Sequence, residues 1–267
     1  MLTDITLGQY FPGDSLLHRL DPRTKILATL LFFCGIFLAD GYTSYFILIA
    51  FTVILVGSAD IPAKLLARSL KPLWLLIILT VGVHIFSTPG TVVFSIGPLV
   101  ATIEGIRQAS FMTVRLVLLI LVASLLTLTT SPIVLTDGIE HLLSPFRRIG
   151  LPAHELAMMM TIALRFIPTL LEETDRIMKA QTARGADFAN GNILRRIKNM
   201  VPLLVPLFIS AFRRADELAV AMEARCYRGG ENRTRMKELQ YSYRDAIAFL
   251  AITVLLVLLG GLRWIAH

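Results

Sequence analysis

Apolar runs long enough to cross a membrane dominate this chain, and short polar stretches separate them. A helix needs roughly 20 apolar residues to cross the hydrocarbon core of a bilayer. The pattern therefore predicts an all-α integral membrane protein with about five transmembrane helices. The predicted spans are residues 26–39, 42–57, 72–86, 106–130 and 247–264.

Two connections between these spans have a recognisable character. Residues 61–71 carry Lys64, Arg68 and Lys71 and fit an interfacial loop or a short helix. Residues 87–104 contain two prolines and two glycines, so they fit a loop or a short hairpin.

The orientation in the membrane follows from the basic residues, which are enriched in cytoplasmic loops. Three basic residues closely precede the first span and three more lie in residues 61–71, whereas residues 40–41 and 87–106 contain none. This asymmetry predicts a cytoplasmic N-terminus and a C-terminus outside. No basic patch followed by an apolar core opens the chain, so we expect no cleavable leader. The predicted segments are 1–130 (N-terminal spans), 131–244 (cytoplasmic or interfacial) and 245–267 (last span).

Residues 131–244 contain two predicted long helices, each with an apolar start and a charged end. The apolar starts, residues 153–171 and 201–212, fit a position in the membrane or on it, and interior prolines are expected to bend both helices. Residues 193–200 are basic and amphipathic and predict a separate helix lying on the interface.

The charged ends of the two long helices repeat one another 41 positions apart. The matching stretches begin at Asp175 and Asp216, share an alanine at one further offset, and end in Ala-Arg. A membrane protein that presents one helix end twice is predicted to meet two similar soluble partners, or one partner with two similar sites. The two ends are Ala183-Arg184-Gly185 and Ala224-Arg225-Cys226.

Each residue of the Ala-Arg-Gly end suits docking. Gly185 can adopt the left-handed conformation that stops a helix, and Ala183 is small enough for a partner to approach closely. Arg184 offers a planar fork that suits a carboxylate or backbone carbonyls. An arginine near a helix C-terminus also complements the helix dipole, which is the alternative interpretation of a single copy. The matched repeat favours docking.

Composition agrees with a membrane location, because 55% of the 267 residues are hydrophobic and only 17% are charged. The net charge of +7 suits a cytoplasmic face near anionic lipid or acidic partner surfaces. Nucleic acid is the rival partner for a basic protein, and the small aqueous part argues against it. Two cysteines, Cys34 and Cys226, cannot form a disulfide framework.

A few residues outside the repeat are candidates for contacts. Arg115 lies well inside the span 106–130, where a charge is a functional candidate by default. It is predicted to contact another helix or a membrane partner, with snorkelling to the interface as the alternative. Met158, Met159 and Met160 give a flexible apolar surface that fits core packing or an adaptable contact with a partner.

Enzymatic and metal sites find little support in the sequence. Glu172, Glu173 and Asp175, even with His154 and Glu155, fit no compact ligand spacing, so a solvated helix face is expected instead of a metal site. The sequence contains no phosphate-binding loop of the Gly-x-x-x-x-Gly-Lys-Ser/Thr type, no His-Glu-x-x-His and no Gly-x-Ser-x-Gly. A membrane-embedded enzyme and a self-contained secondary transporter are the alternative functions; the latter would need broken helices at matching places in two halves.

The two Ala-Arg ends resemble the motifs of the T component of energy-coupling factor (ECF) transporters, prokaryotic importers of vitamins and metals. Their contexts are Gln181-Thr-Ala-Arg-Gly185 and Ala221-Met-Glu-Ala-Arg-Cys-Tyr-Arg-Gly229. The opening Asp21-Pro-Arg-Thr-Lys25 and the step Arg165-Phe-Ile-Pro168 are also similar, and the resemblance spans nearly the whole chain.

Cys226 departs from the family pattern, which usually has glycine at this position. The departure leaves open whether the second helix stops there or at Gly229-Gly230. On this basis Arg225→Glu is expected to matter less than Arg184→Glu, because a shifted stop would change where Arg225 points.

The resemblance implies a non-catalytic scaffold in a prokaryotic cell membrane. Arg184 and Arg225 would each dock in a groove of one of two similar or identical ABC-type ATPase subunits. Those subunits would bind ATP and Mg, and this chain would hold no cofactor of its own. The long helices would act as crossed coupling helices that pass motion to a membrane-embedded S component, which binds the vitamin or metal.

Overall fold

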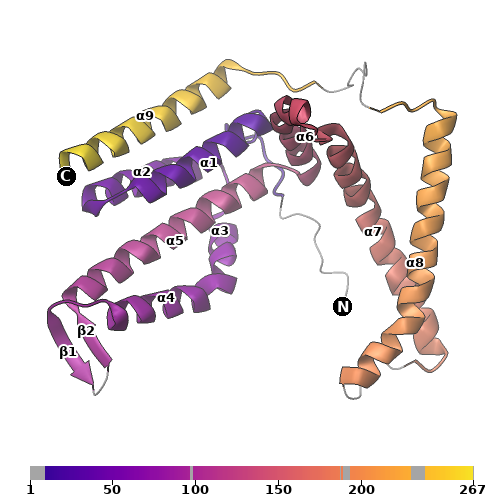
Figure 1. Cartoon of the computed structure of the whole chain (residues 1–267), viewed down its shortest axis with the longest axis horizontal. Helices are drawn as coiled ribbons and strands as arrows, with labels where there is room; N and C mark the ends of the chain where they lie inside the picture. Colours follow the sequence, from indigo (N-terminus) through magenta and orange to yellow (C-terminus); the bar gives the residue numbers. More distant parts are fainter. Residues whose placement is uncertain (1–9, 97–98, 187, 189–192, 230–237, 267) are drawn as a thin grey trace. The chain divides into compact units, whose positions relative to one another are not determined.

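The computed structural model describes residues 10–96, 99–186, 188, 193–229 and 238–266. They form two compact units, whose elements are labelled in Figure 1. Residues 10–139 and 238–266 make up the first, here called the bundle unit. Residues 140–229 make up the second, here called the long-helix unit.

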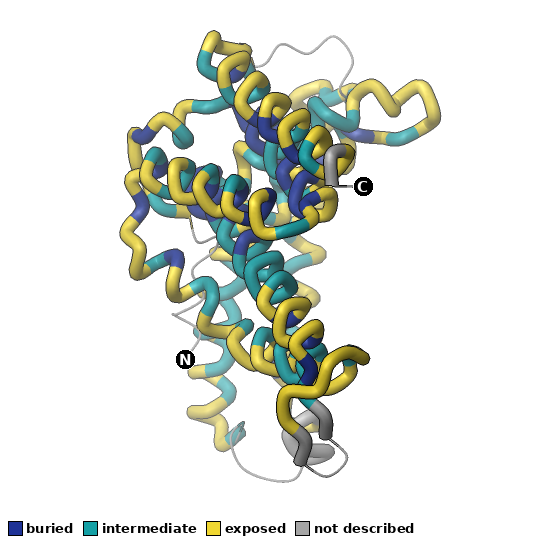
Figure 2. Tube along the Cα trace, turned by 90° about the vertical axis from the view of Figure 1, so that its left-hand side faces the viewer, coloured by how far each residue is buried: buried dark blue, intermediate teal, exposed yellow. Residues whose placement is uncertain are grey.

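Four helices enclose the main core of the bundle unit: α1 (Pro22–Leu38), α2 (Gly41–Ser58), α5 (Ile103–Thr129) and α9 (Tyr243–Ala266). Phe32 and Ile36 of α1, Leu48 of α2, Leu118 of α5 and Leu259 of α9 are nearly or fully buried there. Buried stretches, dark blue in Figure 2, alternate with exposed ones along the chain. That alternation is expected when each helix buries only one face.

Polar side chains at the start of α1 connect it to α9, more than 200 positions away. Asp21 caps α1, because its carboxylate accepts a hydrogen bond from the Arg23 amide at 2.9 Å, and Pro22 occupies the first helical position. Asp245 accepts from the amides of Asp21 at 2.9 Å and of Ser242 at 2.8 Å. The buried carboxylate of Asp245 thus accepts hydrogen bonds from backbone amides at the N-termini of both α1 and α9.

A second helical layer packs against α5. It consists of α3 (Ala63–Leu70), a 3-10 turn η1 (Lys71–Leu73) and α4 (Trp74–Ser87). The antiparallel strands β1 (Val92–Ile96) and β2 (Leu99–Thr102) connect α4 to α5, and Thr102 caps α5 through the Gly105 amide. The structure confirms the short helix in residues 61–71 and the short hairpin in residues 87–104.

Five helical stretches of the described chain are long and apolar enough to cross a membrane: α2, Ala63–Ser87, α5, α7 (Ala153–Ala183) and α9. Their number agrees with the prediction, but one member differs. Helix α1 has 17 residues, at the lower end of the range that can cross a bilayer, and is not among the five. Helix α7 is among them, because its apolar start continues without a break into its charged end.

The long-helix unit consists of the end of α6 (Pro132–Leu143), a 3-10 turn η2 (Ser144–Ile149), α7 and α8 (Ile193–Ala224). Helices α7 and α8 pack against each other. The prediction of a separate interfacial helix at residues 193–200 is wrong, because these residues form the first two turns of α8. Both helices continue through their interior prolines, Pro168 in α7 and Pro202 and Pro206 in α8.

Candidate functional site

The first arginine end is a helix stop in which every residue has a defined role. Helix α7 ends at Ala183, Arg184 is the cap, and Gly185 has a left-handed φ of 89°. The Gly185 amide donates to the Thr182 carbonyl at 2.9 Å, and the Ala186 amide donates to the Gln181 carbonyl at 3.0 Å. This pair of bonds is a Schellman motif, which satisfies the last free carbonyls of a helix.

The second arginine end repeats this geometry bond for bond. Helix α8 ends at Ala224, and Cys226 has a left-handed φ of 54° although it is not glycine. The Cys226 amide donates to the Glu223 carbonyl at 2.8 Å, and the Tyr227 amide donates to the Met222 carbonyl at 3.0 Å. The stop of the second helix therefore lies at Cys226, ahead of Gly229, whereas Gly230 lies outside the described residues. The reason for expecting a smaller effect of Arg225→Glu is thereby removed.

The side chains that the motif presents are accessible within their unit. Ala183, Arg184, Ala224 and Arg225 are all exposed. An exposed arginine beside an exposed alanine leaves room for a partner's backbone to approach the helix tip. The structure thus places both predicted docking elements on exposed helix tips of the long-helix unit.

The two long helices run antiparallel and touch at equivalent positions of the repeat. Arg214 of α8 donates to the carboxylate of Glu173 of α7 at 2.5 Å, and the two residues are 41 positions apart, the spacing of the repeat itself. Near the end of α7, the Gln181 side chain donates to the Pro202 carbonyl at 3.3 Å. Arg184 lies 11 positions after Glu173 on α7, and Arg225 lies 11 positions after Arg214 on α8. Each separation corresponds to about 16 Å of helix.

Sequence reasoning missed a polar contact that joins the second end to the start of α7. The hydroxyl of Tyr227 lies 3.3 Å from His154 Nε2, and His154 Nδ1 lies 3.0 Å from the Glu140 carboxylate. In the sequence, His154 is a candidate only for a metal site. Its contact with Tyr227 spans 73 positions and leaves no periodic signal in the sequence.

A groove of about 410 Å³ lies beside Arg225, between the start of α7 and the end of α8. Met158 and Met222 line it together with Arg225 itself. Met159 and Met160 do not line this groove, and 55% and 45% of their surfaces are exposed. Met158 therefore faces this groove, and Met159 and Met160 offer flexible apolar surface elsewhere on α7.

Arg115 contacts a neighbouring helix of the bundle unit. Its Nε donates to the hydroxyl of Tyr45 on α2 at 3.2 Å. Its guanidinium carbon lies 5.5 Å from the centre of the Phe37 ring, within the range of a cation–π contact.

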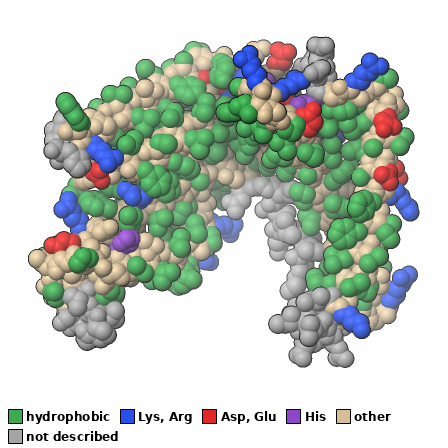
Figure 3. All heavy atoms as spheres, in the orientation of Figure 1, with side chains coloured by type: hydrophobic (Ala, Val, Ile, Leu, Met, Phe, Trp, Pro, Cys, Tyr) green, Lys and Arg blue, Asp and Glu red, His purple; other side chains and the backbone are tan. Residues whose placement is uncertain are grey.

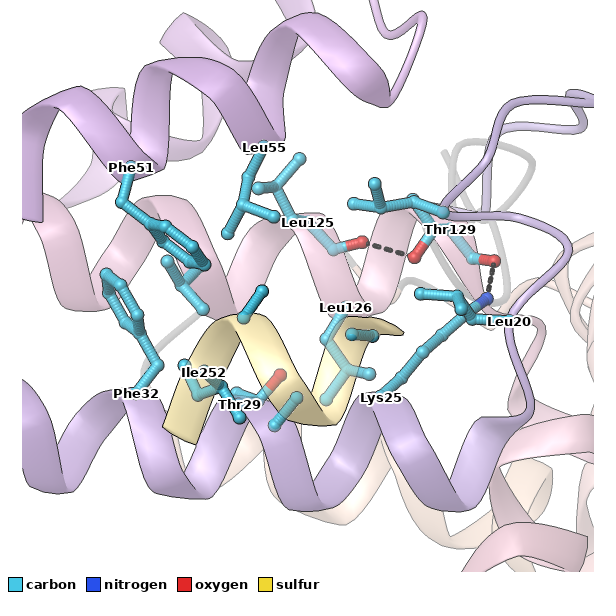
Figure 4. Close-up of a pocket in the computed structure, with 15 residues that line it drawn as sticks. Leu20, Lys25, Thr29, Phe32, Phe51, Leu55, Leu125, Leu126, Thr129 and Ile252 are labelled. Atoms are coloured by element: carbon cyan, nitrogen blue, oxygen red, sulfur yellow. Dashed lines mark hydrogen bonds between the residues drawn. The ribbon is translucent and has the colours of Figure 1, made fainter. Parts of the chain in front are cut away.

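A cavity of the bundle unit is lined mostly by apolar side chains. It measures about 130 Å³, most of its lining is Leu, Phe and Ala, and among the described residues that line it only Lys25 is ionisable. Figure 4 shows Lys25 reaching from α1 toward the Thr129 carbonyl, to which it donates at 3.0 Å. Lys25 also donates to Thr130 Oγ1 and to the His18 carbonyl, so protein acceptors already surround its ammonium.

The acidic residues near the end of α7 pair with basic side chains. Glu173 contacts Arg214, and Asp175 contacts Lys179 one turn along the helix at 2.6 Å. In the part of the chain that the structure describes, no group of three or more His, Cys, Asp or Glu side chains could hold a metal ion.

Comparison with known proteins identifies the family. Residues 13–236 match the family model described as cobalt transport protein, CbiQ. The energy-coupling factor transporter transmembrane protein EcfT of Acidaminococcus fermentans is 64% identical over 264 residues, 99% of this chain and 98% of the relative. The proteins of the same name from Thermosediminibacter oceani and Bacillus subtilis are 59% and 50% identical, over 96% and 98% of this chain and 97% and 100% of the relatives. The chain therefore belongs to the family of energy-coupling factor transporter transmembrane proteins.

Proposed function

We propose that this chain couples two ABC-type ATPase subunits to a membrane-embedded S component that binds a vitamin or metal. Arg184 and Arg225 each dock in a groove of one ATPase subunit. The ATPase subunits bind ATP and Mg, and this chain carries no catalytic group. The observation that carries the proposal is the bond-for-bond identity of two helix ends that each expose one arginine.

The symmetry of the long-helix unit supports two similar docking partners. When two copies of a structure are related by a two-fold axis, equivalent residues meet each other at the axis. Glu173 and Arg214 are equivalent positions of the repeat and contact each other. Each motif arginine therefore lies 11 positions beyond this ion pair, at the same distance along its own helix. A pair of similar ATPase subunits related by a two-fold axis would meet both helix ends in the same way.

The contact between the helices also gives a route for motion. A shift of the α7 tip is resisted by α8, because the Glu173–Arg214 pair and the Gln181–Pro202 bond connect the two helices. Movement of the ATPase subunits relative to each other would thus change the crossing of α7 and α8 as a whole. The S component is proposed to sense that change.

An apolar stripe on α8 supports a membrane-embedded partner. Hydrophobic side chains recur along α8 every three or four positions and remain between 42% and 68% exposed within the described chain. Figure 3 shows hydrophobic side chains over much of the visible face of the two long helices. Exposed apolar patches of this extent mark a protein or membrane contact. The stripe consists of Val201, Leu204, Val205, Phe208, Ile209 and Phe212.

The location that fits this function is a prokaryotic cell membrane, with the N-terminus and the arginine ends in the cytoplasm and the C-terminus outside. ATPase subunits are cytoplasmic because their nucleotide is there. The arginine ends must therefore face the same side.

The docking proposal is tested by reversing the charge of each arginine. Arg184→Glu and Arg225→Glu should each weaken association with the ATPase subunits by about thirtyfold, the factor that corresponds to roughly 2 kcal/mol for a central interface arginine. Each should also abolish substrate uptake, and because the two ends have the same geometry, the effects should be similar. Association is measured by co-purification and by titration of the ATPase subunits onto the chain in lipid nanodiscs.

Matched controls exist on the same two helices. Arg176 on α7 and Arg213 on α8 are exposed arginines outside the motif, and their change to Glu alters net charge equally. If Arg184→Glu and Arg225→Glu assembled and transported as well as these controls, the docking role would be wrong.

A further inference from the structure

The end of α8 is held in place by a contact that follows the helix stop. Tyr227 comes directly after the left-handed residue Cys226, and its hydroxyl lies 3.3 Å from Nε2 of His154. His154 lies in the first turn of α7, and its Nδ1 lies 3.0 Å from the carboxylate of Glu140, in the last turns of α6. Three elements therefore meet through one imidazole ring.

The chemistry of the ring suits this position. A neutral imidazole that is protonated on Nδ1 donates to Glu140 and accepts the Tyr227 hydroxyl proton on Nε2. An imidazolium donates from both nitrogens, and the tyrosine oxygen can accept. Either form keeps both contacts. The His154 and Glu140 side chains are 29% and 12% exposed, so water competes only partly for them.

The left-handed turn at Cys226, which directly precedes Tyr227, needs support from its surroundings. Left-handed backbone is disfavoured for a residue with a side chain, and it persists where the surroundings hold it. Cys226 adopts it with a φ of 54°, directly after Arg225. Tyr227 is the residue directly after Cys226, so a contact that holds Tyr227 also restrains the Cys226 turn.

We propose that His154 is a positioning residue for Arg225. By holding Tyr227, it keeps the Cys226 turn closed and presents Arg225 to the ATPase subunit in one direction. Because Glu140 holds the same ring, displacement of the second end acts on the start of α7 and the end of α6. The consequence for docking rests on the proposed function, whereas the effect on the turn does not.

The first end is connected to its neighbour differently. Its hydrogen bond to the neighbouring helix runs from Gln181 to the Pro202 carbonyl and lies before the helix stop. The left-handed turn that follows is at Gly185, and glycine adopts that conformation without support from a contact. The loss of His154 should therefore loosen the second end and leave the first one unchanged. This difference separates local positioning from a general loss of structure.

The test uses the natural thiol of Cys226, which is exposed. A nitroxide is attached to Cys226 in the full chain carrying Cys34→Ala, in lipid nanodiscs without ATPase subunits. Tyr227→Phe removes only the hydroxyl, and His154→Phe removes both ring nitrogens while keeping a planar ring. Both changes should make the nitroxide spectrum at Cys226 more mobile. Glu155→Gln, an exposed neighbour of His154, is the matched control and should leave the spectrum unchanged.

A second label site reports on the first end. A nitroxide on Ala183→Cys, in a chain with Cys34→Ala and Cys226→Gly, should keep its spectrum in the Tyr227→Phe and His154→Phe variants. An unchanged spectrum at Cys226, or equal loosening at both sites, would overturn the positioning role.

The link to docking is measured separately on the unlabelled chain. Tyr227→Phe should weaken binding of the ATPase pair about fivefold, the factor that corresponds to one net hydrogen bond. Normal binding by Tyr227→Phe, together with lost binding by Arg225→Glu, would refute the positioning of Arg225 while leaving the docking proposal intact. Normal binding by Arg225→Glu would refute docking, and the nitroxide spectra would still decide whether His154 holds the turn.

Discussion

At the scale of single residues, one left-handed backbone angle ends each long helix directly after its arginine. Gly185 and Cys226 both adopt the left-handed conformation, with φ values of 89° and 54°. Glycine reaches this region without a steric penalty, whereas the Cβ of cysteine meets the following carbonyl. The same helix stop is therefore built at unequal conformational cost at the two ends.

This difference predicts that Cys226→Gly stabilises the protein. The left-handed conformation costs a residue with a side chain about 1–2 kcal/mol. The extra freedom of glycine in the unfolded chain offsets roughly 0.5–1 kcal/mol of that gain. The net effect should be a gain of about 0.5 kcal/mol, visible as a higher midpoint of thermal unfolding by circular dichroism in detergent.

The reciprocal change is the natural control. Gly185→Cys should lower the midpoint by a similar amount, because nothing lies within 4 Å of an added Cβ and only the backbone angle opposes it. A loss of stability in Cys226→Gly would show that the cysteine side chain makes a contact worth more than the strain.

At the scale of elements, the bundle unit depends on the close approach of its first and last helices. An added Cβ on Gly35 of α1 would lie 3.0 Å from Leu256 Cδ2 and 3.4 Å from Leu259 Cδ1 of α9. Small residues allow this kind of close packing between membrane helices. The contact adjoins the core formed by α1, α2, α5 and α9.

Gly35→Val should therefore destabilise the bundle unit by about 1–3 kcal/mol, the usual cost of overpacking a closely packed contact. The loss is measured as a lower unfolding midpoint in detergent, or as increased trypsin sensitivity of the full chain. Gly82→Val in α4 is the matched control, because no atom lies within 4 Å of its added Cβ. Equal losses in both variants would mean that helix propensity, and not packing against α9, sets the effect.

The long helices show what local patterns can and cannot predict at this scale. The apolar start and charged end of α7 were predicted, and the structure confirms them in one continuous helix. For α8, the change from basic to apolar composition at position 200 was interpreted as a boundary, but the helix continues through it. The side-chain composition of a helix changes where its surroundings change. The backbone hydrogen bonds can continue through the same position, so the helix does not end there.

At the scale of the whole molecule, the proposed function requires a defined orientation in the membrane. Both arginine ends must reach cytoplasmic ATPase subunits. Basic loops resist translocation, and the segment that carries these ends is rich in arginine. Orientation is therefore a property that charge distribution predicts and that labelling can measure.

Cys226 again provides the probe. In a chain with Cys34→Ala, a membrane-impermeant maleimide should label Cys226 in inside-out vesicles and not in intact cells. A cysteine appended after the last residue should show the opposite pattern, because the C-terminus is expected outside. Labelling of Cys226 in intact cells would contradict the cytoplasmic placement of the arginine ends.

The all-α membrane architecture and the two arginine ends can be predicted from the sequence alone. Hydropathy and helix stops act over one or a few turns, so their signals lie within short windows of the chain. The pairing of α1 with α9 through Asp21 and Asp245, and the contact of Tyr227 with His154, were decided only by the tertiary structure. These contacts join residues 73 to 224 positions apart, and such side chains come together through the packing of helices and not through any local period. The left-handed turn at Cys226 belongs with them, because a residue other than glycine holds that conformation only where its surroundings support it.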